Sequence, residues 1–297
     1  MYAFLYFIFY LFSLLPWFIL YFISDGIYIL VYYVFGYRKK VVLNNLQIAF
    51  PEKTEKERIR IAKDFYHNFI DNFIETLKLI SISEKEMLRR FKTNNINVLN
   101  DLYEKVDKVQ IITGHYFNWE FANLSVGIES KFPFLVVYMP LKNKSFNKLI
   151  YTIRTKFKTV LISATNYRNE FKKYSSGKYS LILVSDQNPG NPENAYWGNF
   201  FGKKTPLVKG PEKGSKQNNT AVIYADFYKI KRGFYQLDFE LISINPREDF
   251  KKEGTLTKLL LHKIEESIKQ HPANYLWSHK KWKHEFDEKK HGHLIID

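Results

Sequence analysis

The amino terminus constrains this chain most, because residues 1 to 23 (MYAFLYFIFYLFSLLPWFILYFI) carry no charge. Only Ser13 and Pro16 interrupt the apolar run. A helix of this length is about 35 Å long, enough to cross the roughly 30 Å hydrocarbon core of a bilayer. Pro16 lies near the middle of the run, where it is expected to kink the helix or to mark a re-entrant bend. We therefore expect a retained N-terminal transmembrane helix.

Two other interpretations compete with a membrane anchor. A cleaved signal peptide normally has a basic start and a small-residue cleavage pattern, and both are missing here. A buried core helix remains the alternative. After Asp25 the chain stays apolar to Gly36 and then continues Tyr37-Arg38-Lys39-Lys40. By the positive-inside bias this cluster places the downstream chain on the cytoplasmic side. The sequence thus predicts a membrane anchor at residues 1–36 and one catalytic domain at residues 37–297.

The charge balance of the chain indicates which class of binding partner to expect. The 45 Lys and Arg against 30 Asp and Glu leave a net charge of +15, and aromatic residues make up 18% of the chain. Excess cations indicate a polyanionic neighbour, and rings together with cations are typical of membrane interfaces. We expect an anionic membrane surface as partner and no nucleic acid. The chain has no cysteine, which excludes disulfides, thiolate metal sites and a cysteine nucleophile.

Beyond Lys40 the pattern is that of a folded α/β domain. Thr54 and Glu57 form a capping box before a long amphipathic helix that ends near residue 80, and Ser83 with Glu86 opens a short one. Strands and helices then alternate, with strands at 109–113, 134–138, 160–162 and 180–185 and helices at 118–128, 145–157 and from 167. Two longer strands at 220–229 and 233–244 precede a helix at 254–270. This order predicts a central, mostly parallel mixed sheet flanked by helices. The tail at 287–297 is expected to be frayed.

One candidate site stands out in KVQIITGHYFNWEFANL, residues 108–124. The apolar strand ends at Gly114-His115, and Glu120 follows in the first turn of the next helix. Loops at the carboxyl ends of parallel strands are where active sites gather. His115 is a candidate general base, with Glu120 as the carboxylate that orients it. A hydrogen-bonded structural corner is the alternative, because a His-x4-acid spacing also arises by chance in a chain with this many acidic residues.

Several motifs in order along the chain resemble the lipid A biosynthesis (lauroyl/myristoyl) acyltransferase family, of the His-x4-acid glycerolipid acyltransferase superfamily. They are GHYFNWE, the basic and Asn-Leu region from Tyr37 to Phe69, LVSDQNPG with WGNFFGKKTPLVKGP, and NYLWSHKKWK. The resemblance implies an inner-membrane enzyme that moves a fatty acyl group from acyl carrier protein to a hydroxyl of a glycolipid precursor. It also implies His115 as base and Glu120 as its partner.

The same resemblance supplies candidate substrate-binding residues. Arg154 matches an arginine near the family's site and is suited to bind a phosphate or an oxyanion. Asp186 and Gln187 follow an apolar strand and either position a substrate or brace the loop. Asn118 is expected to cap the helix and to lie at the site. Arg168 is a weaker candidate. Phe200 and Phe201 are expected to pack on the sheet; the alternatives are that their loop lines an acyl tunnel or dips into the bilayer.

No cofactor and no metal is expected. With no cysteine and no G-x-S-x-G motif, direct attack of the acceptor hydroxyl on the donor is the expected route. His279, His291 and His293 are interpreted as structural or tail residues. Phe117 and Lys158 stand where the family commonly has glycine, which leaves the turn at Phe117 open. Other functions also remain open: the same chemistry on an aminolipid, a phosphoglycolipid or a pigment, or a noncatalytic basic protein that binds membrane surfaces.

Overall fold

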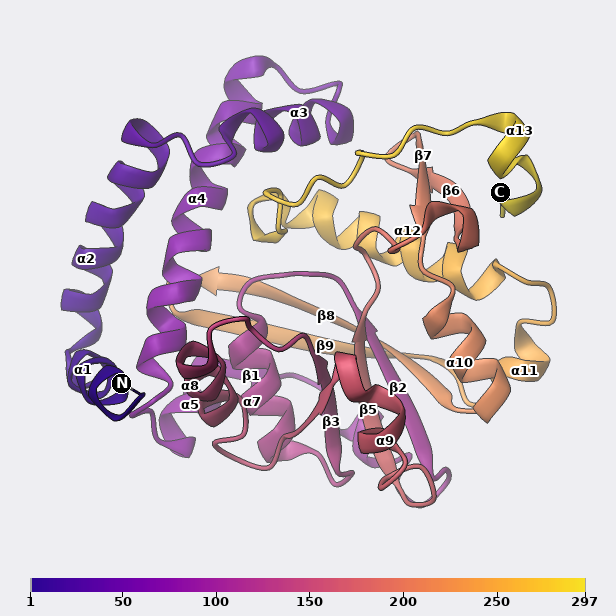
Figure 1. Ribbon diagram of the computed structural model, residues 1–297, viewed down its shortest axis with the longest axis horizontal. Helices are drawn as coiled ribbons and strands as arrows, with labels where there is room; N and C mark the ends of the chain where they lie inside the picture. Colours follow the sequence, from indigo (N-terminus) through magenta and orange to yellow (C-terminus); the bar gives the residue numbers. More distant parts are fainter. Residues whose placement is uncertain (1, 297) are drawn as a thin grey trace.

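The computed structural model describes residues 2–296 and is built around a seven-stranded sheet with helices on both faces (Figure 1). The strand order is β1-β9-β8-β2-β5-β3-β4, and every neighbouring pair is parallel except β8 with β9. The predicted mostly parallel mixed sheet is confirmed. The strands are β1 (Phe91–Thr93), β2 (Lys108–Thr113), β3 (Phe134–Tyr138), β4 (Val160–Ser163), β5 (Tyr179–Val184), β8 (Ala221–Lys231) and β9 (Phe234–Ser243).

The α-helices are α1 (Tyr2–Leu14), α2 (Trp17–Ile29), α3 (Lys39–Ala49), α4 (Glu55–Lys78), α5 (Glu84–Arg90), α6 (Asn97–Asn100), α7 (Trp119–Glu129), α8 (Lys144–Arg154), α9 (Tyr167–Phe171), α10 (Gly210–Asn218), α11 (Pro246–Asp249), α12 (Thr255–Gln270) and α13 (Glu288–His291). A short π-helical segment, Leu30–Val34, continues α2. The helices and strands predicted beyond residue 40 are present, with ends shifted by only a few residues.

Local chemistry explains where the helices begin. The Thr54 hydroxyl accepts a hydrogen bond from the Glu57 amide, and the Glu57 carboxylate accepts one from the Thr54 amide, so the predicted capping box is confirmed. The Ser83 hydroxyl caps α5 in the same way by accepting from the Glu86 amide. These caps satisfy amide groups that an isolated helix end leaves unpaired.

The two faces of the sheet are covered by different helices. Gln110 of β2 donates to the Pro211 carbonyl of α10, and Asp226 of β8 accepts from Ser267 of α12, so α10 and α12 lie on one face. Tyr235 of β9 points to the other face, where it donates to Glu75 of α4 and contacts Phe121 of α7. The carboxyl ends of β2 and β5 therefore lie between a layer formed by α10 and α12 and a layer formed by α4 and α7.

The N-terminal apolar segment breaks at Pro16, as expected, but it forms two separate helices rather than one kinked helix. Helix α1 ends at Leu14 and α2 begins at Trp17, because Pro16 has no amide hydrogen to continue the ladder. Figure 1 shows α1 end-on and α2 lying in the plane of the view, so the chain turns sharply between them. Trp17–Val34 is the one described segment long and apolar enough to cross a membrane, and 22% of its residues are buried.

Two further expectations need correction. The tail is not frayed over its described part: α13 forms, His291 stacks on Trp197 at 4.4 Å, and the Ile296 amide donates to the Trp197 carbonyl. Residue 297 lies outside the described residues. Residues 196–207 form a hairpin of β6 (Tyr196–Phe200) and β7 (Lys203–Leu207) that was not predicted. Phe200 is fully buried and contacts Trp282, and Phe201 contacts Phe50, so these rings pack against aromatic residues outside the central sheet rather than on the sheet as expected.

Candidate active site

His115 and Asp186 are brought together by strand register. Strands β2 and β5 are parallel neighbours with Thr113 opposite Val184. His115 lies two residues beyond the end of β2, and Asp186 lies two residues beyond the end of β5. Because paired parallel strands end at the same edge of the sheet, equal steps past the two ends place these side chains side by side.

The imidazole of His115 is held on both of its nitrogens. Nδ1 lies 2.6 Å from Asp186 Oδ1, and the His115 amide donates to the same oxygen at 3.2 Å. Nε2 lies 3.0 Å from Nε2 of Gln187. An ionised carboxylate can only accept, so Nδ1 carries the proton and His115 Nε2 holds the lone pair. This is the tautomer that a general base requires.

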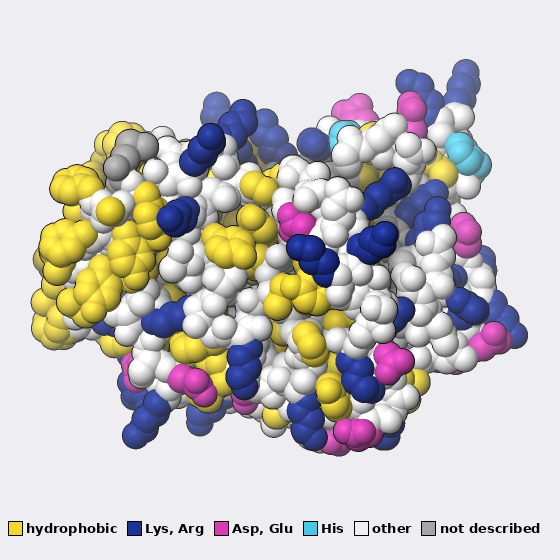
Figure 2. Space-filling model, turned by 60° about the horizontal axis from the view of Figure 1, so that its bottom comes forward, with side chains coloured by type: hydrophobic (Ala, Val, Ile, Leu, Met, Phe, Trp, Pro, Cys, Tyr) yellow, Lys and Arg dark blue, Asp and Glu magenta, His cyan; other side chains and the backbone are white. Residues whose placement is uncertain are grey.

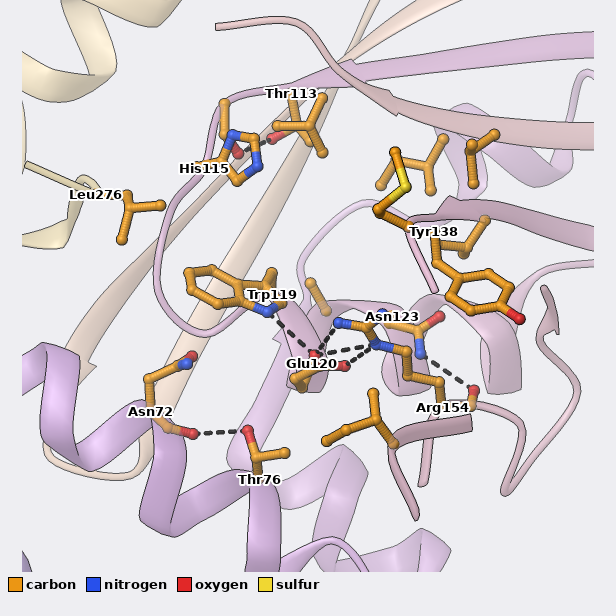
Figure 3. Close-up of a pocket in the computed structure, with 18 of the residues that line it drawn as sticks. Asn72, Thr76, Thr113, His115, Trp119, Glu120, Asn123, Tyr138, Arg154 and Leu276 are labelled. Atoms are coloured by element: carbon orange, nitrogen blue, oxygen red, sulfur yellow. Dashed lines mark hydrogen bonds and ion pairs between the residues drawn. The ribbon is translucent and has the colours of Figure 1, made fainter. Parts of the chain in front are cut away.

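Glu120 does not contact His115 by any hydrogen bond among residues 2–296, which differs from the predicted pairing. Its carboxylate accepts from Nε and Nη2 of Arg154 at 2.6–3.0 Å and from Nε1 of Trp119 at 3.1 Å. In Figure 3 Trp119 lies between His115 and Glu120, and its ring centroid is 6.4 Å from that of His115. The carboxylate that orients the imidazole is that of Asp186.

The C-terminal motif NYLWSHKKWK completes the site. The Tyr275 hydroxyl donates to Asp186 Oδ2 at 2.8 Å, so both oxygens of that carboxylate are engaged. The Leu276 amide donates to the His115 carbonyl, and the Phe117 amide donates to the Asn274 carbonyl. This pairing fixes the loop that carries His115. The sequence analysis did not name Tyr275 as a candidate, although the motif that contains it is one of those that resemble the family.

Asp186 stays ionised because of its neighbours. Burial alone raises the pKa of this carboxyl, but the charge and hydrogen bond of His115, the charge of Lys281 and the hydrogen bond of Tyr275 together lower its pKa to about 2. Lys281 is 1% exposed, and its ammonium has no hydrogen-bond partner among the described residues. Burial lowers the pKa of Lys281 to about 8 despite the nearby charge of Asp186. The sequence reasoning did not single out Lys281.

The turn around His115 is shaped by close packing. A Cβ at Gly114 would lie 2.7 Å from Cζ of the Tyr116 ring, so this position needs glycine for close approach. Phe117 is fully buried and packs between Phe65 and Trp119, at ring-centroid distances of 5.8 and 5.6 Å. Its ring therefore fills the core rather than the cavity.

Asn118 caps the amino terminus of helix α7. Its Oδ1 accepts from the amides of Glu120 and Phe121, which confirms the predicted helix cap, and its Nδ2 donates to Glu75. The side chain is fully buried. Since both ends of its amide are engaged inside the protein, the geometry favours capping over contact with a substrate.

A cavity of about 460 Å³ opens beside His115 (Figure 3). His115, Glu120 and Arg154 line it, and most of the remaining wall is apolar, including Val136, Ile150 and Ile182. The side chain of His115 is 26% exposed and that of Arg154 is 23% exposed, so both are accessible from the cavity. Apolar walls with a few convergent polar groups suit a ligand that is mostly hydrocarbon.

The other candidate residues lie elsewhere. Arg168 is exposed on α9, and His293 is exposed near the C-terminus. Nε2 of His279 contacts the side-chain amide of Asn188, and burial lowers the pKa of His279 to about 4. Lys158 donates to the Ile128 carbonyl. In the part of the chain that the structure describes, no group of three or more His, Cys, Asp or Glu residues is arranged to hold a metal ion.

The Arg154–Glu120 ion pair can be tested separately from the imidazole. Glu120 is 5% exposed on its side chain, so Arg154→Ala leaves a buried carboxylate unpaired and should destabilise the fold by about 3–5 kcal/mol. Thermal unfolding measures this loss. The double variant Arg154→Met with Glu120→Gln should regain most of the stability, because no lone charge remains. If the double variant also regains full activity, the pair is structural only.

The fold and the site define a class of α/β proteins in which a histidine at the end of a central strand is hydrogen-bonded to a buried carboxylate beside an apolar cavity. The chain belongs to the bacterial lipid A biosynthesis acyltransferase family, whose sequence pattern matches residues 1–284. It is 18% identical over 247 residues to the lipid A biosynthesis palmitoleoyltransferase of Escherichia coli (strain K12), with 83% of this chain and 79% of that protein covered. The lipid A biosynthesis acyltransferase of Shigella flexneri is similar to the same extent.

Proposed function

We propose that this enzyme moves a fatty acyl group from acyl carrier protein to a hydroxyl of a lipid A-type glycolipid precursor, at the cytoplasmic face of the inner membrane. The observation that carries the proposal is the Asp186–His115 hydrogen bond. It leaves Nε2 of His115 as a proton acceptor beside an apolar cavity. The family membership supports acyl transfer in lipid A biosynthesis.

The step is a direct transfer. The acceptor hydroxyl oxygen attacks the thioester carbonyl carbon, and its proton passes to Nε2 of His115. Asp186 stabilises the imidazolium that forms. The tetrahedral intermediate then collapses, the carbon–sulfur bond breaks, and the leaving thiolate takes the proton back from His115. The products are an ester and the free thiol of the carrier, so atoms and charges balance.

Gln187 and Arg154 have distinct parts in this proposal. The Gln187 amide donates to Nε2 of His115 at 3.0 Å, and this is the place where the acceptor hydroxyl must bind. Gln187 therefore moves aside or holds the hydroxyl oxygen when the acceptor enters. Arg154 uses Nε and Nη2 on Glu120, and Nη1 has no partner among the described residues. That nitrogen is available for a phosphate or for the developing oxyanion.

The lining of the cavity supports a route without an acyl-enzyme. The chain contains no cysteine, and the described residues that line the cavity include no serine. Both substrates must then be bound together. The net charge of +15 favours an acidic carrier protein and an anionic membrane surface as partners.

The test incubates the purified protein with acyl carrier protein carrying a labelled acyl group. With donor alone, intact-protein mass spectrometry should detect no acylated enzyme. Adding a lipid A precursor should release the carrier thiol and produce an acceptor heavier by one acyl group. Transfer to an aminolipid or phosphoglycolipid instead would identify a different acceptor. No thiol release with any membrane lipid extract would favour a noncatalytic membrane-binding protein.

A further inference from the structure

Helix α2 lies antiparallel to α4 along its whole length. The contacts run in opposite directions along the two helices. The Tyr21 and Ser24 hydroxyls donate to Glu75 and Asp71 at 3.0 and 2.7 Å, and the rings of Tyr28 and His67 stack with centroids 3.5 Å apart. At the two ends, the Lys78 ammonium lies 5.6 Å from the ring centre of Trp17, and the Lys63 ammonium lies 5.9 Å from that of Tyr33 in the π-helical continuation. The apolar segment is thus docked on the folded domain at every turn.

These contacts prevent α2 from crossing a bilayer while it stays docked. Helix α4 carries charged side chains along its length, EKERIRIAKDFYHNFIDNFIETLK, and charges are costly within hydrocarbon. Leaving α4 is also costly. Asp71 and Glu75 are fully buried, and Ser24 and Tyr21 of α2 supply hydrogen bonds to them that would be lost.

A second link ties the middle of the segment to the sheet. Arg232, in the turn between β8 and β9, donates to Asp25 at 2.6 Å and to Asp71 at 2.7 Å. Asp25 lies near the centre of the Trp17–Val34 segment, so a spanning helix would hold this ion pair near the middle of the membrane. Its side chain is 46% exposed, which suits a position at headgroup level.

The face of the two helices that points away from the domain is apolar. Helix α1 exposes residues at helical spacing: Phe4, Phe7, Ile8, Leu11 and Leu14. Helix α2 exposes Phe18, Phe22 and Ile29, and its π-helical continuation exposes Tyr33, followed by Phe35. Figure 2 shows hydrophobic side chains gathered over the end of the molecule that holds α1 and α2. An exposed apolar surface of this extent marks an interaction site.

We propose that α1 and α2 form an in-plane platform that enters one leaflet of the bilayer and does not cross it. This inference rests on the proposed function, since it explains how a membrane lipid reaches the cavity. The platform lies flat, with its outer face in the boundary between headgroups and acyl chains. The chain is then attached to one side of the membrane, with both termini on that side.

A lipid surface fits this face better than a second protein does. Rings at the border of the platform are paired with accessible cations of the rest of the chain: the Lys148 ammonium lies 4.3 Å from the centre of the Tyr2 ring, and the Lys63 ammonium lies 5.9 Å from that of Tyr33. Rings paired with cations at the edge of an apolar surface are typical of membrane interfaces. Anionic lipids would also balance the positive charge of the chain.

The platform is continuous with the cavity. Helix α1 packs on α8 through Phe9 and Phe146, whose ring centroids are 6.2 Å apart, and Ile150 and Arg154 of α8 line the cavity. Exposed apolar residues of the cavity wall, Met139 and Leu141, precede the same helix. A lipid in the leaflet would thus enter the cavity sideways, without passing through water.

The test measures depth by spin labelling. Because the chain has no cysteine, Phe7→Cys, Phe18→Cys, Phe22→Cys, Ile29→Cys and Tyr33→Cys each provide one labelling position in the full chain. The labelled proteins are bound to vesicles of phosphatidylethanolamine and phosphatidylglycerol, and collisions with oxygen and a nickel chelate report depth. We expect all five labels at shallow depths in one leaflet. Ser176→Cys, exposed on a distant loop, should remain in water.

Two results would overturn the proposal. A spanning helix would separate labels at 18 and 33 by about 22 Å along the membrane normal, with the intermediate labels near the centre. Labels shielded from both collision reagents would mean that a second copy or another protein covers the face. These measurements use no substrate, so they are independent of whether the enzyme transfers acyl groups.

A charge on the platform provides a second readout. Phe22→Glu should lower vesicle affinity in co-sedimentation by about tenfold or more, because the ring can no longer be buried in lipid. The matched control is Ile244→Glu, which places the same charge at an exposed apolar position after β9. Equal affinity of the two variants would contradict the platform. Phe22 is 79% exposed, so the substitution should leave the fold intact.

Discussion

Replacing His115 by alanine is expected to lower the rate of acyl transfer by about 10²- to 10⁴-fold, the usual contribution of a positioned general base. The reason is that, in the proposed mechanism, Nε2 of this imidazole accepts the proton of the acceptor hydroxyl, while Asp186 accepts the hydrogen bond of Nδ1. The measurement is release of carrier thiol in the presence of donor and acceptor. Undiminished release would remove His115 from the mechanism.

A companion variant guards against loss of folding. His115→Asn can still donate a hydrogen bond toward Asp186, so its thermal unfolding should stay near that of the parent protein, while its activity should be as low as that of the alanine variant. Asp186 also keeps the hydrogen bond of Tyr275 in both variants. An inactive but stable asparagine variant would assign the loss to proton transfer.

Asp186→Asn is expected to reduce the rate by a comparable factor, about 10²- to 10⁴-fold. An amide can donate to Nδ1, which moves the imidazole proton to Nε2 and removes the lone pair that accepts the substrate proton. The imidazolium also loses its counter-charge. The kinetic readout is kcat for acyl transfer, which should fall much more than KM changes.

Controls separate this carboxylate from other buried acids. Asp226 lies on the face of the sheet that α10 and α12 cover, and burial raises the pKa of its carboxyl. Asp226→Asn should leave activity unchanged. Glu120→Gln keeps His115 and Asp186 in place, so it should affect catalysis less than Asp186→Asn does. The reverse order would restore Glu120 as the partner of His115.

The pH dependence follows from the same carboxyl. The pKa of Asp186 is lowered to about 2 in the folded protein, below the ordinary value of about 3.9. A carboxyl with a lowered pKa stabilises the fold above the unfolded value, and this stabilisation is lost as the pH falls through about 2. Between pH 5 and 8 Asp186 therefore stays ionised. Thermal unfolding followed from pH 7 to pH 2 should show a loss of stability at the acid end that is smaller in Asp186→Asn, which has no carboxyl to protonate.

Much of the fold could be predicted because its signals are local. The Thr54–Glu57 cap, the strand at residues 134–138 and the helix beginning after Asn118 depend on neighbours within one turn or one strand. The break at Pro16 was foreseen as a kink, but two separate helices resulted, with the second extending to Val34. Membrane attachment by a spanning helix was inferred from the length of the apolar run alone. That length gives no information about which part of the protein the helix packs against.

The parts that were missed depend on distant contacts. The His291 tail is ordered because it stacks on Trp197, and the hairpin of β6 and β7 consists of two strands of only five residues each. Tyr275 and Lys281 reach Asp186 from a segment about ninety residues further along the chain. One signal was available for Asp186 itself: it lies two residues beyond an apolar strand, as His115 does.

The sequence by itself determined the residue types of the chemistry and the elements that carry them. It also placed His115 and Asp186 at the carboxyl ends of two apolar strands. Only the tertiary structure decided that Asp186, rather than Glu120, orients the imidazole, because the choice depends on β2 and β5 being parallel neighbours in register. Strand order is a property of long-range pairing, whereas the spacing between His115 and Glu120 is a property of one short segment. For the same reason, only the docking of α2 on α4 indicates that an apolar N-terminus can lie along a membrane without crossing it.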